Sequence, residues 1–199
     1  MTSEQGSVCG AAEIRFAVRD GATRLAHLYQ RDPLRVLFPT AEPGDAESLV
    51  RLAEAVGSEE GGWLIADGVW RSVSEERRYL KAIRRHAYSA VLVAELDGSL
   101  VGRLSIGRDS HPASEHVADV GLMVADGYRR RGIGRALMEA AEAWARSVGV
   151  RKIELHVFPH NEAALVLYDR LGYRQVGIRH GHFRRSDGYA DAVLMEKDL

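Results

Sequence analysis

The chain contains 199 residues and carries a formal net charge of −1 at pH 7. This length suits one domain of ordinary size with a sizeable core, and the near-neutral charge provides no overall attraction to nucleic acid or to an anionic membrane. The single cysteine, Cys9, excludes an internal disulfide framework and a cysteine-based zinc site. Neither a bilayer-spanning apolar run nor a signal-peptide pattern is present, so we expect a cytoplasmic protein with no nucleic-acid or membrane partner.

The first 33 residues fit the later pattern poorly and form an N-terminal extension, residues 1–33, of unknown role. Alternation from Ile14 predicts a short strand, and the stretch from Thr23 to Gln30 is compatible with a short helix. The extension is either a partly ordered arm or an additional strand at a sheet edge.

A regular pattern begins at residue 34 and predicts a domain over residues 34–199. Its first elements are a strand over residues 34–40 and, after a turn, an amphipathic helix that stops at Gly57. This strand and this helix are the first two elements of an alternating α/β pattern.

The segment 58–71 has no clean period, and a loop of this length in a compact domain is often functional. We expect it to form a wall of a ligand-binding site, with Trp63 and Trp70 either in that wall or packed in the core. A second helix is predicted over residues 74–88, and its basic run is interpreted as a solvated face: Lys81, Arg84, Arg85 and His86.

Two apolar runs, residues 90–96 and 100–106, flank an Asp-Gly turn and predict a β-hairpin. After a polar link, alternation over residues 117–124 predicts a half-buried central strand. This strand leads directly into the most informative loop of the chain.

The loop after the central strand has the features of an anion-binding site. Gly132 and Gly134 lack Cβ atoms, so their backbone N–H groups can approach a phosphate closely at the positive end of the following helix. The loop does not end in the Gly-Lys-Ser/Thr of an ATP-binding P-loop, and Leu137 stands where the dinucleotide fingerprint requires a third glycine. Three arginines supply positive charge: Arg129, Arg130 and Arg131.

An amphipathic helix follows and ends near Gly149, and residues 152–157 alternate as a strand. Strand, helix and strand in succession predict a right-handed parallel crossover. A further helix begins at Asn161, and two closing strands are predicted at 173–178 and 190–195, joined by a polar link over 179–189.

Three features, in this order, resemble the GCN5-related N-acetyltransferases. They are the loop Arg129-x-x-Gly132-x-Gly134, the asparagine Asn161 after the next strand, and the segment from Leu167 to Tyr173. The resemblance covers about 165 residues and implies an α/β fold, with a mixed sheet of about seven strands flanked by about four helices.

The resemblance implies acetyl-CoA as co-substrate and an amine as acceptor. In this family the central strand splays from its parallel neighbour, so that backbone groups near Met123 and Val124 can pair with the pantetheine arm, and one N–H, that of Val124, can polarise the thioester carbonyl. The residues expected to bind the coenzyme are Met123, Val124, Arg129, Arg130, Arg131, Gly132, Ile133, Gly134, Arg135 and Asn161. Asn161 either meets the coenzyme, caps its helix, or does both.

Two catalytic residues follow from the resemblance. Asp119 stands in the strand where many relatives carry a glutamate and is the expected base, with Glu115 and His116 as nearby substitutes; it is otherwise a surface carboxylate or an ion-pair partner. Tyr168 matches the family position of the acid that protonates the departing thiolate, and is otherwise a core aromatic.

The histidines give weaker signals. His156 fits a polar outward position of its strand, and His160 lies in the loop before Asn161. A His-x-His pair, His180 and His182, is a poor metal signal by itself, so no metal site is expected.

The predicted function is therefore transfer of acetyl from acetyl-CoA to a primary amine, by direct attack in a ternary complex, with a small-molecule amine as acceptor. Two alternatives remain: a peptide or protein acetyltransferase acting on N-termini or lysines, and a non-catalytic acyl-CoA-binding module. The acceptor pocket is expected to come from the segment 57–73, the helix 74–88 and the link 179–189. A homodimer is compatible with the resemblance.

Overall fold

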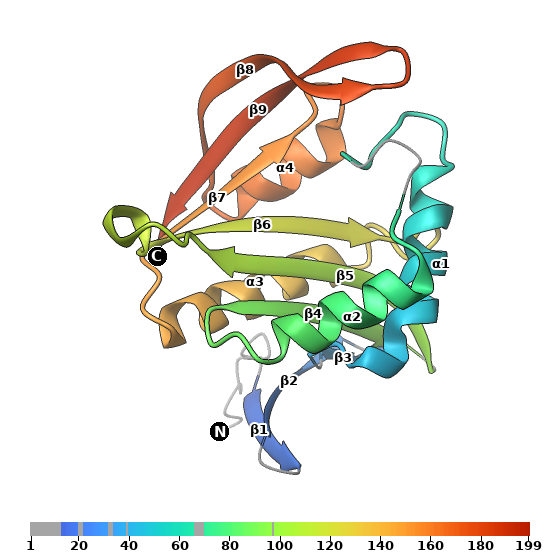
Figure 1. Cartoon of the computed structure of the whole chain (residues 1–199), viewed down its shortest axis with the longest axis vertical. Coiled ribbons are helices and arrows are strands. Elements are labelled where there is room, and N and C mark those ends of the chain that lie inside the picture. Colours follow the sequence, from blue (N-terminus) through green and yellow to red (C-terminus); the bar gives the residue numbers. More distant parts are fainter. Residues whose placement is uncertain (1–12, 20–21, 32–33, 39, 66–69, 97) are drawn as a thin grey trace, which may run out of the picture.

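A computed structural model describes residues 13–19, 22–31, 34–38, 40–65, 70–96 and 98–199. These residues form a mixed nine-stranded sheet in the order β1-β2-β3-β4-β5-β6-β7-β9-β8 (Figure 1). The predicted α/β fold is confirmed, and the two strands beyond the expected seven belong to the N-terminal extension. The strands are β1 (Glu13–Arg19), β2 (Ala22–Arg31), β3 (Leu34–Phe38), β4 (Ser89–Leu96), β5 (Ser99–Arg108), β6 (Val117–Val124), β7 (Lys152–Val157), β8 (Arg174–Arg185) and β9 (Gly188–Asp198).

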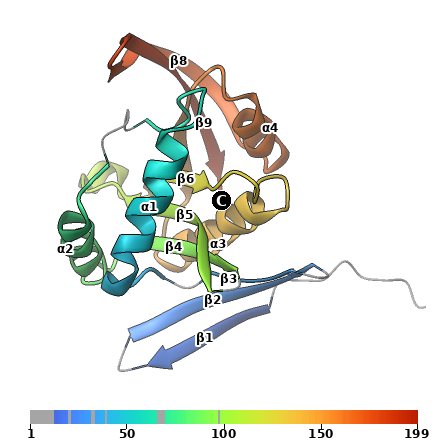
Figure 2. The same cartoon turned by 90° about the vertical axis from the view of Figure 1, so that its right-hand side faces the viewer.

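Four α-helices flank this sheet in the described part of the chain: α1 (Ala46–Gly57), α2 (Val73–Ile83), α3 (Ile133–Ser147) and α4 (Glu162–Arg170). Helices α1 and α2 lie on one side of the central strands and α3 on the other, as the rotated view shows (Figure 2). Two hydrophobic cores result, one between the sheet and α1 and α2, and a larger one between the sheet and α3 and α4. This two-layer burial is what a sheet with two apolar faces requires.

The short helix considered for Thr23 to Gln30 is wrong, because these residues lie within β2. Strand β2 pairs antiparallel with β1 on one side and with β3 on the other. Pairing on both edges satisfies the backbone groups that a helix would otherwise satisfy internally, so the neighbouring strands override local helix propensity. The N-terminal extension thus continues the sheet.

The central strands part from each other after a short parallel contact. Strand β6 pairs with β7 at Val117↔Lys152, Ala118↔Ile153 and Asp119↔Glu154, and within these two fully described strands the pairing ends there. On its other edge, β6 stays paired with β5 as far as Gly102↔Val124. A wedge-shaped gap therefore opens between β6 and β7 toward their carboxyl ends.

The last two strands are longer than predicted. Most of the expected 179–189 link belongs to β8 and β9, which form one long hairpin that rises beyond the helices (Figure 1). Register shifts lie between Gln175 and Gly177 and between Arg179 and Phe183. These irregularities allow a polar, histidine- and arginine-rich sequence to stay extended while its twist changes.

Polar contacts fasten the helices to the sheet. The Ser72 side chain caps α2 in a reciprocal capping box with Glu75, which fixes the start of this helix one residue before the predicted one. On the other face, Lys197 of β9 donates to both carboxylate oxygens of the buried Glu142 of α3 at 2.7 Å. The Lys197–Glu142 pair connects α3 to the sheet, whereas the Ser72–Glu75 box stabilises the start of α2 itself.

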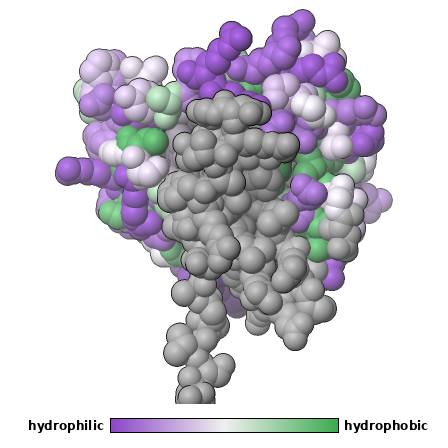
Figure 3. Space-filling model, turned by 90° about the horizontal axis from the view of Figure 1, so that it is seen from below, coloured by the Kyte–Doolittle hydropathy of each residue, from purple (hydrophilic) through white to green (hydrophobic). Residues whose placement is uncertain are grey.

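None of the described helices is long and apolar enough to cross a membrane. Seen from below, the described surface is largely hydrophilic, with scattered rather than continuous hydrophobic side chains (Figure 3).

Candidate active site

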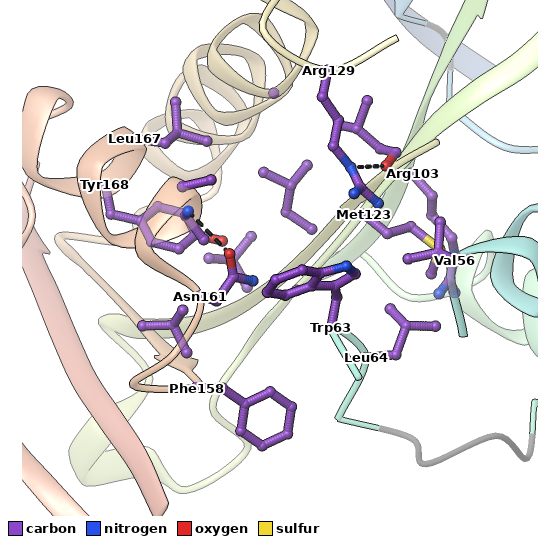
Figure 4. A pocket seen from close by; sticks show the side chains of 18 of the residues that line it. Val56, Trp63, Leu64, Arg103, Met123, Arg129, Phe158, Asn161, Leu167 and Tyr168 are labelled. Atoms are coloured by element: carbon purple, nitrogen blue, oxygen red, sulfur yellow. Dashed lines mark hydrogen bonds between the residues drawn. The ribbon is translucent and has the colours of Figure 1, made fainter. Parts of the chain in front are cut away.

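A cavity of about 980 Å³ lies in the gap between β6 and β7. Its floor is formed by β5 and β6, with Arg103 and Met123 visible there (Figure 4). Asn161 and Tyr168 project from one side, and Trp63 and Leu64 from the opposite side (Figure 4). The cavity therefore has one wall from the start of α4 and a second wall from the segment after α1.

Alternation of β6 determines which groups reach the cavity. The side chains of Asp119 and Met123 face it, Gly121 leaves space between them, and the side chains at even positions pack against the core beneath α3 while also bordering the cavity. The Ala125 N–H donates to the Val101 carbonyl of β5 at 2.9 Å, so the next N–H back, that of Val124, points the other way, into the gap. The donor expected to polarise a thioester carbonyl thus faces the site.

The glycine loop has the geometry of an anion cradle. Gly132 is the N-cap of α3 and has φ +88°, a left-handed conformation that favours glycine. A Cβ at Gly134 would lie 3.3 Å from the Leu167 side chain, which would have to shift by a few tenths of an ångström. Ile133 is buried in the core, so only its backbone N–H is suited to a ligand. The first N–H groups of a helix have no intrahelical acceptor, which leaves them for phosphate oxygens.

The three loop arginines have different surroundings. Arg129 makes a two-point ion pair with Glu59, with both N–O distances at 2.7 Å, and its Nε donates to the Val124 carbonyl at 2.9 Å. Arg130 is exposed and has φ +57°. The guanidinium carbon of Arg131 lies 5.8 Å from the Tyr128 ring centroid, and Arg131 does not line the cavity. Arg129 thus mainly holds Glu59 and the Val124 carbonyl in place, and Arg130 is better placed to supply positive charge for an anion.

Asp119 lies on the cavity wall, and its environment favours the protonated form. Desolvation by the cavity walls raises the pKa of Asp119 to about 6, the charge of Glu154 acts in the same direction, and Arg179 opposes it. The side chain is still 62% exposed, which is compatible with desolvation because a concave wall admits some water while excluding the bulk solvent. A carboxylate with a pKa near neutrality is suited to proton transfer at physiological pH.

His156 also belongs to the site, although its sequence pattern indicated only an outward polar position. Its Nδ1 lies 3.8 Å from the Asp119 carboxylate, and its buried Nε2 has no hydrogen-bond partner among the described residues. Burial, followed by Arg179 and His182, lowers the pKa of His156, so the ring is neutral at pH 7. The substitutes considered for Asp119, Glu115 and His116, are exposed and do not line the cavity.

The predicted residues Asn161 and Tyr168 both line the cavity. The Asn161 Oδ1 accepts from the Ala164 N–H at 3.2 Å, so Asn161 caps α4 while its side chain lines the cavity (Figure 4). Tyr168 packs edge-on against Tyr173 and also lines the cavity. Burial raises the pKa of Tyr168 well above its usual value, so the phenol remains protonated.

The other histidines have structural contacts. The His160 ring stacks on Phe158, and its Nε2 is 2.8 Å from the Gly61 carbonyl. His180 pairs with Asp191 at 2.8 Å. Within the described ranges, no group of three or more metal-ligating side chains comes together.

The expected acceptor wall is only partly right. The segment after α1 lines the cavity through Trp63, Leu64, Ile65 and Trp70, whereas α2 and the 179–189 segment contribute no lining residue in the described structure. The latter acts indirectly, because Arg185 donates to the Leu64 carbonyl at 2.9 Å. The sequence pattern did not single out Arg103, although a lone charge in the apolar run of β5 was an available signal.

Known proteins with similar sequences are acetyltransferases. A model of the acetyltransferase (GNAT) family matches residues 54–173. The L-amino acid N-acetyltransferase AaaT of Escherichia coli K12 is 36% identical over 110 residues, 53% of this chain and 66% of that protein. The ribosomal protein bS18-alanine N-acetyltransferase of the same organism is 38% identical over 68 residues, 34% of this chain and 46% of that protein. Both alignments span less than two thirds of the relatives' own lengths.

Solved structures resemble the chain over a larger share. A GNAT-family acetyltransferase from Streptococcus pneumoniae has a TM-score of 0.75 and 28% identity, covering 82% of this chain and 99% of that one. The structure of yncA from Salmonella typhimurium with acetyl-CoA has a TM-score of 0.72 and 19% identity, covering 82% and 94% respectively. The latter identity supports the shared fold alone.

Proposed function

Because this chain belongs to the GNAT family of acetyltransferases, we propose that it transfers the acetyl group of acetyl-CoA to the primary amine of a small molecule. The observation that carries the proposal is the opening between β6 and β7, where the Val124 N–H faces the gap beside the glycine loop. The loop would bind the pyrophosphate through backbone N–H groups and Arg130, and the unpaired strand edge would bind the pantetheine arm.

The reaction needs a neutral amine and a polarised thioester. In the proposed ternary complex, the amine nitrogen attacks the thioester carbon, a C–N bond forms and the C–S bond breaks. The Val124 N–H stabilises the negative charge that develops on the carbonyl oxygen. Asp119 lies about 13 Å from Met123 between α-carbons, so it accepts the proton that the amine loses through a chain of waters along the cavity, with His156 as the adjacent neutral base.

Tyr168 assists departure of the thiolate. Since its raised pKa lies far above that of a thiol near 8.5, complete proton transfer to sulfur is unfavourable. A hydrogen bond from the phenol to the developing thiolate is favourable, because it stabilises charge that appears only as the C–S bond breaks. Solvent can then protonate the released coenzyme.

The relatives support two kinds of acceptor. One is named for L-amino acids and the other for an alanine of a ribosomal protein, so small molecules and protein N-termini are both represented. We favour a small molecule because the cavity is bounded by the segment after α1 and by α4, as Figure 4 shows. The decisive experiment measures thiol release from acetyl-CoA with amino acids, polyamines, other small amines and peptides. Binding of acetyl-CoA without turnover on any of them would indicate a non-catalytic module.

The anion cradle can be tested with two glycines at opposite ends of α3. Gly132→Glu places a side chain and a negative charge in the cradle, so acetyl-CoA binding should weaken on the order of a hundredfold through lost hydrogen bonds and repulsion. Gly149, with φ +83°, has the same left-handed conformation at the other end of the helix as Gly132. Gly149→Glu is therefore the control for strain and charge, and calorimetry should show wild-type affinity. Equal affinities in the two variants would contradict the site assignment.

The role of Asp119 can be tested from the pH dependence. With a pKa of about 6, Asp119 is a base above that pH, so wild-type kcat/KM should rise through pH 6. Asp119→Asn should lose roughly a hundredfold near pH 7.5 and less near pH 10, where more of the amine is already neutral. Glu154→Gln removes a neighbouring negative charge, so it should shift the wild-type rise to lower pH and preserve the plateau. A constant ratio of wild type to Asp119→Asn across pH would assign the base elsewhere.

Tyr168→Phe removes the phenolic hydroxyl and keeps the ring. Turnover should fall roughly tenfold, less than for loss of a full general acid, while the Kd for acetyl-CoA stays within twofold. Tyr173→Phe is the matched control, because Tyr173 packs against Tyr168 but does not line the cavity. Full activity of Tyr168→Phe in steady-state assays would leave Tyr168 as a packing residue only.

A further inference from the structure

Two buried N–H groups at one end of the cavity lack an acceptor. The Nε of Arg103 and the indole Nε1 of Trp70 are both buried, and neither has a hydrogen-bond partner in the part of the chain that the structure describes. The Arg103 guanidinium lies 5.0 Å from the Trp70 ring centroid, and both residues line the cavity. An unpaired buried donor is destabilising and rare in folded proteins, so two such donors side by side require an explanation.

The same end of the cavity contains more cations than anions. Glu76 of α2 is fully buried, at 0% exposure, and accepts from Arg103 at 3.3 Å and from Arg71 at 3.2 Å. Arg71 is 44% exposed and is solvated, whereas Arg103 is only 4% exposed. Besides this long contact with Glu76, Arg103 interacts with the Tyr79 side chain, yet a guanidinium has five N–H donors and the Arg103 Nε has no partner among the described residues.

Arg103 is close to the reacting atoms of the proposed function. It is the cross-strand partner of Met123, and the next residue, Val124, provides the N–H for the thioester oxygen. An anion held by Arg103 would therefore lie within about one side-chain length of the reacting carbon. The carboxylates of Asp119 and Glu154 lie farther along the sheet. The α-carbon of Asp119 is about 13 Å from that of Met123. The cavity thus has a cationic end and an anionic end.

From this arrangement, we infer that the acceptor is an amino acid, whose carboxylate binds to Arg103 and the Trp70 indole N–H while its amine faces the thioester. The inference rests on the proposed function and specifies its substrate class. An arginine and an indole N–H are both pure donors, which suits a carboxylate and rejects a second cation. The apolar walls, formed by Trp63, Leu64 and Phe158, suit an aliphatic or aromatic substrate side chain.

The test compares L-leucine, which has a carboxylate with two acceptor oxygens, with L-leucinamide, which has a neutral carboxamide in its place. Binding of each is measured by calorimetry on protein saturated with CoA, which requires no turnover. Wild-type protein should bind the acid at least tenfold more tightly than the amide. Trp70→Phe removes one donor and keeps an aromatic ring, and should reduce this preference about threefold to tenfold.

Arg103 needs a paired replacement, because its loss alone would leave Glu76 buried and uncompensated. The double variant Arg103→Gln/Glu76→Gln stays neutral and should reduce the acid-over-amide preference at least tenfold. Arg71→Gln is the control, since it removes the other Glu76 contact without altering the lining of the cavity, and it should keep the wild-type preference. A thermal unfolding scan of each variant identifies loss of the fold.

The outcomes separate the two proposals. Equal binding of acid and amide to the wild-type protein, or an unchanged preference in folded Trp70→Phe and Arg103→Gln/Glu76→Gln, overturns the carboxylate site. Tighter binding of a leucine-initiated peptide amide than of leucine also overturns it and indicates a peptide acceptor. A carboxylate preference that follows Arg103 and Trp70, without acetylation of any amine, supports the site and instead overturns the proposed acetyl transfer.

Discussion

The early end of pairing between two parallel strands determines the geometry of the whole site. Strands β6 and β7 are in register only through Asp119↔Glu154, although β6 continues to Val124. A sheet paired along its full length would use the backbone groups of residues 120–124 internally, because buried N–H and C=O groups seek partners. The gap leaves the Val124 N–H facing a cavity, and the crossover through α3 brings the glycine loop to its mouth.

One strand supplies two kinds of chemistry because β-structure alternates. Odd positions of β6 direct Asp119 and Met123 into the cavity, and even positions direct their backbone N–H groups toward the gap. Residues of β5 and β7 that lie beside these positions point to the same face of the sheet. This arrangement places Arg103 and His156 at the cavity. Charges that are distant in sequence thus share one cavity, and Asp119 acquires its raised pKa from that enclosure and from Glu154.

Features encoded within a few consecutive residues were predictable from the sequence. The Gly132 and Gly134 loop, the Asn161 cap and the hairpin over β4 and β5 depend on local backbone conformation, which local sequence specifies. Features that depend on pairing were not predictable. The expected helix at Thr23 to Gln30 became β2 because strands flank it on both sides. The participation of His156 and Arg103 depends on which strands are neighbours, which local sequence does not specify; the lone charge of Arg103 in an apolar run marked that residue but not its partners.

An ion pair connects the donor side of the cavity to the acceptor side. Arg129 follows the central strand, and its partner Glu59 follows α1, seventy residues earlier. The same arginine holds the Val124 carbonyl, so one side chain fixes the strand that carries the Val124 N–H and the segment that precedes Trp63. Arg185 of β8 holds that segment from the other side through the Leu64 carbonyl. Both bonds are made to the segment after α1, which has little helix or strand of its own. The glycine loop and the β8–β9 hairpin therefore fix the position of the acceptor wall. This explains why a sequence can identify the donor site while the acceptor site emerges only from the folded chain.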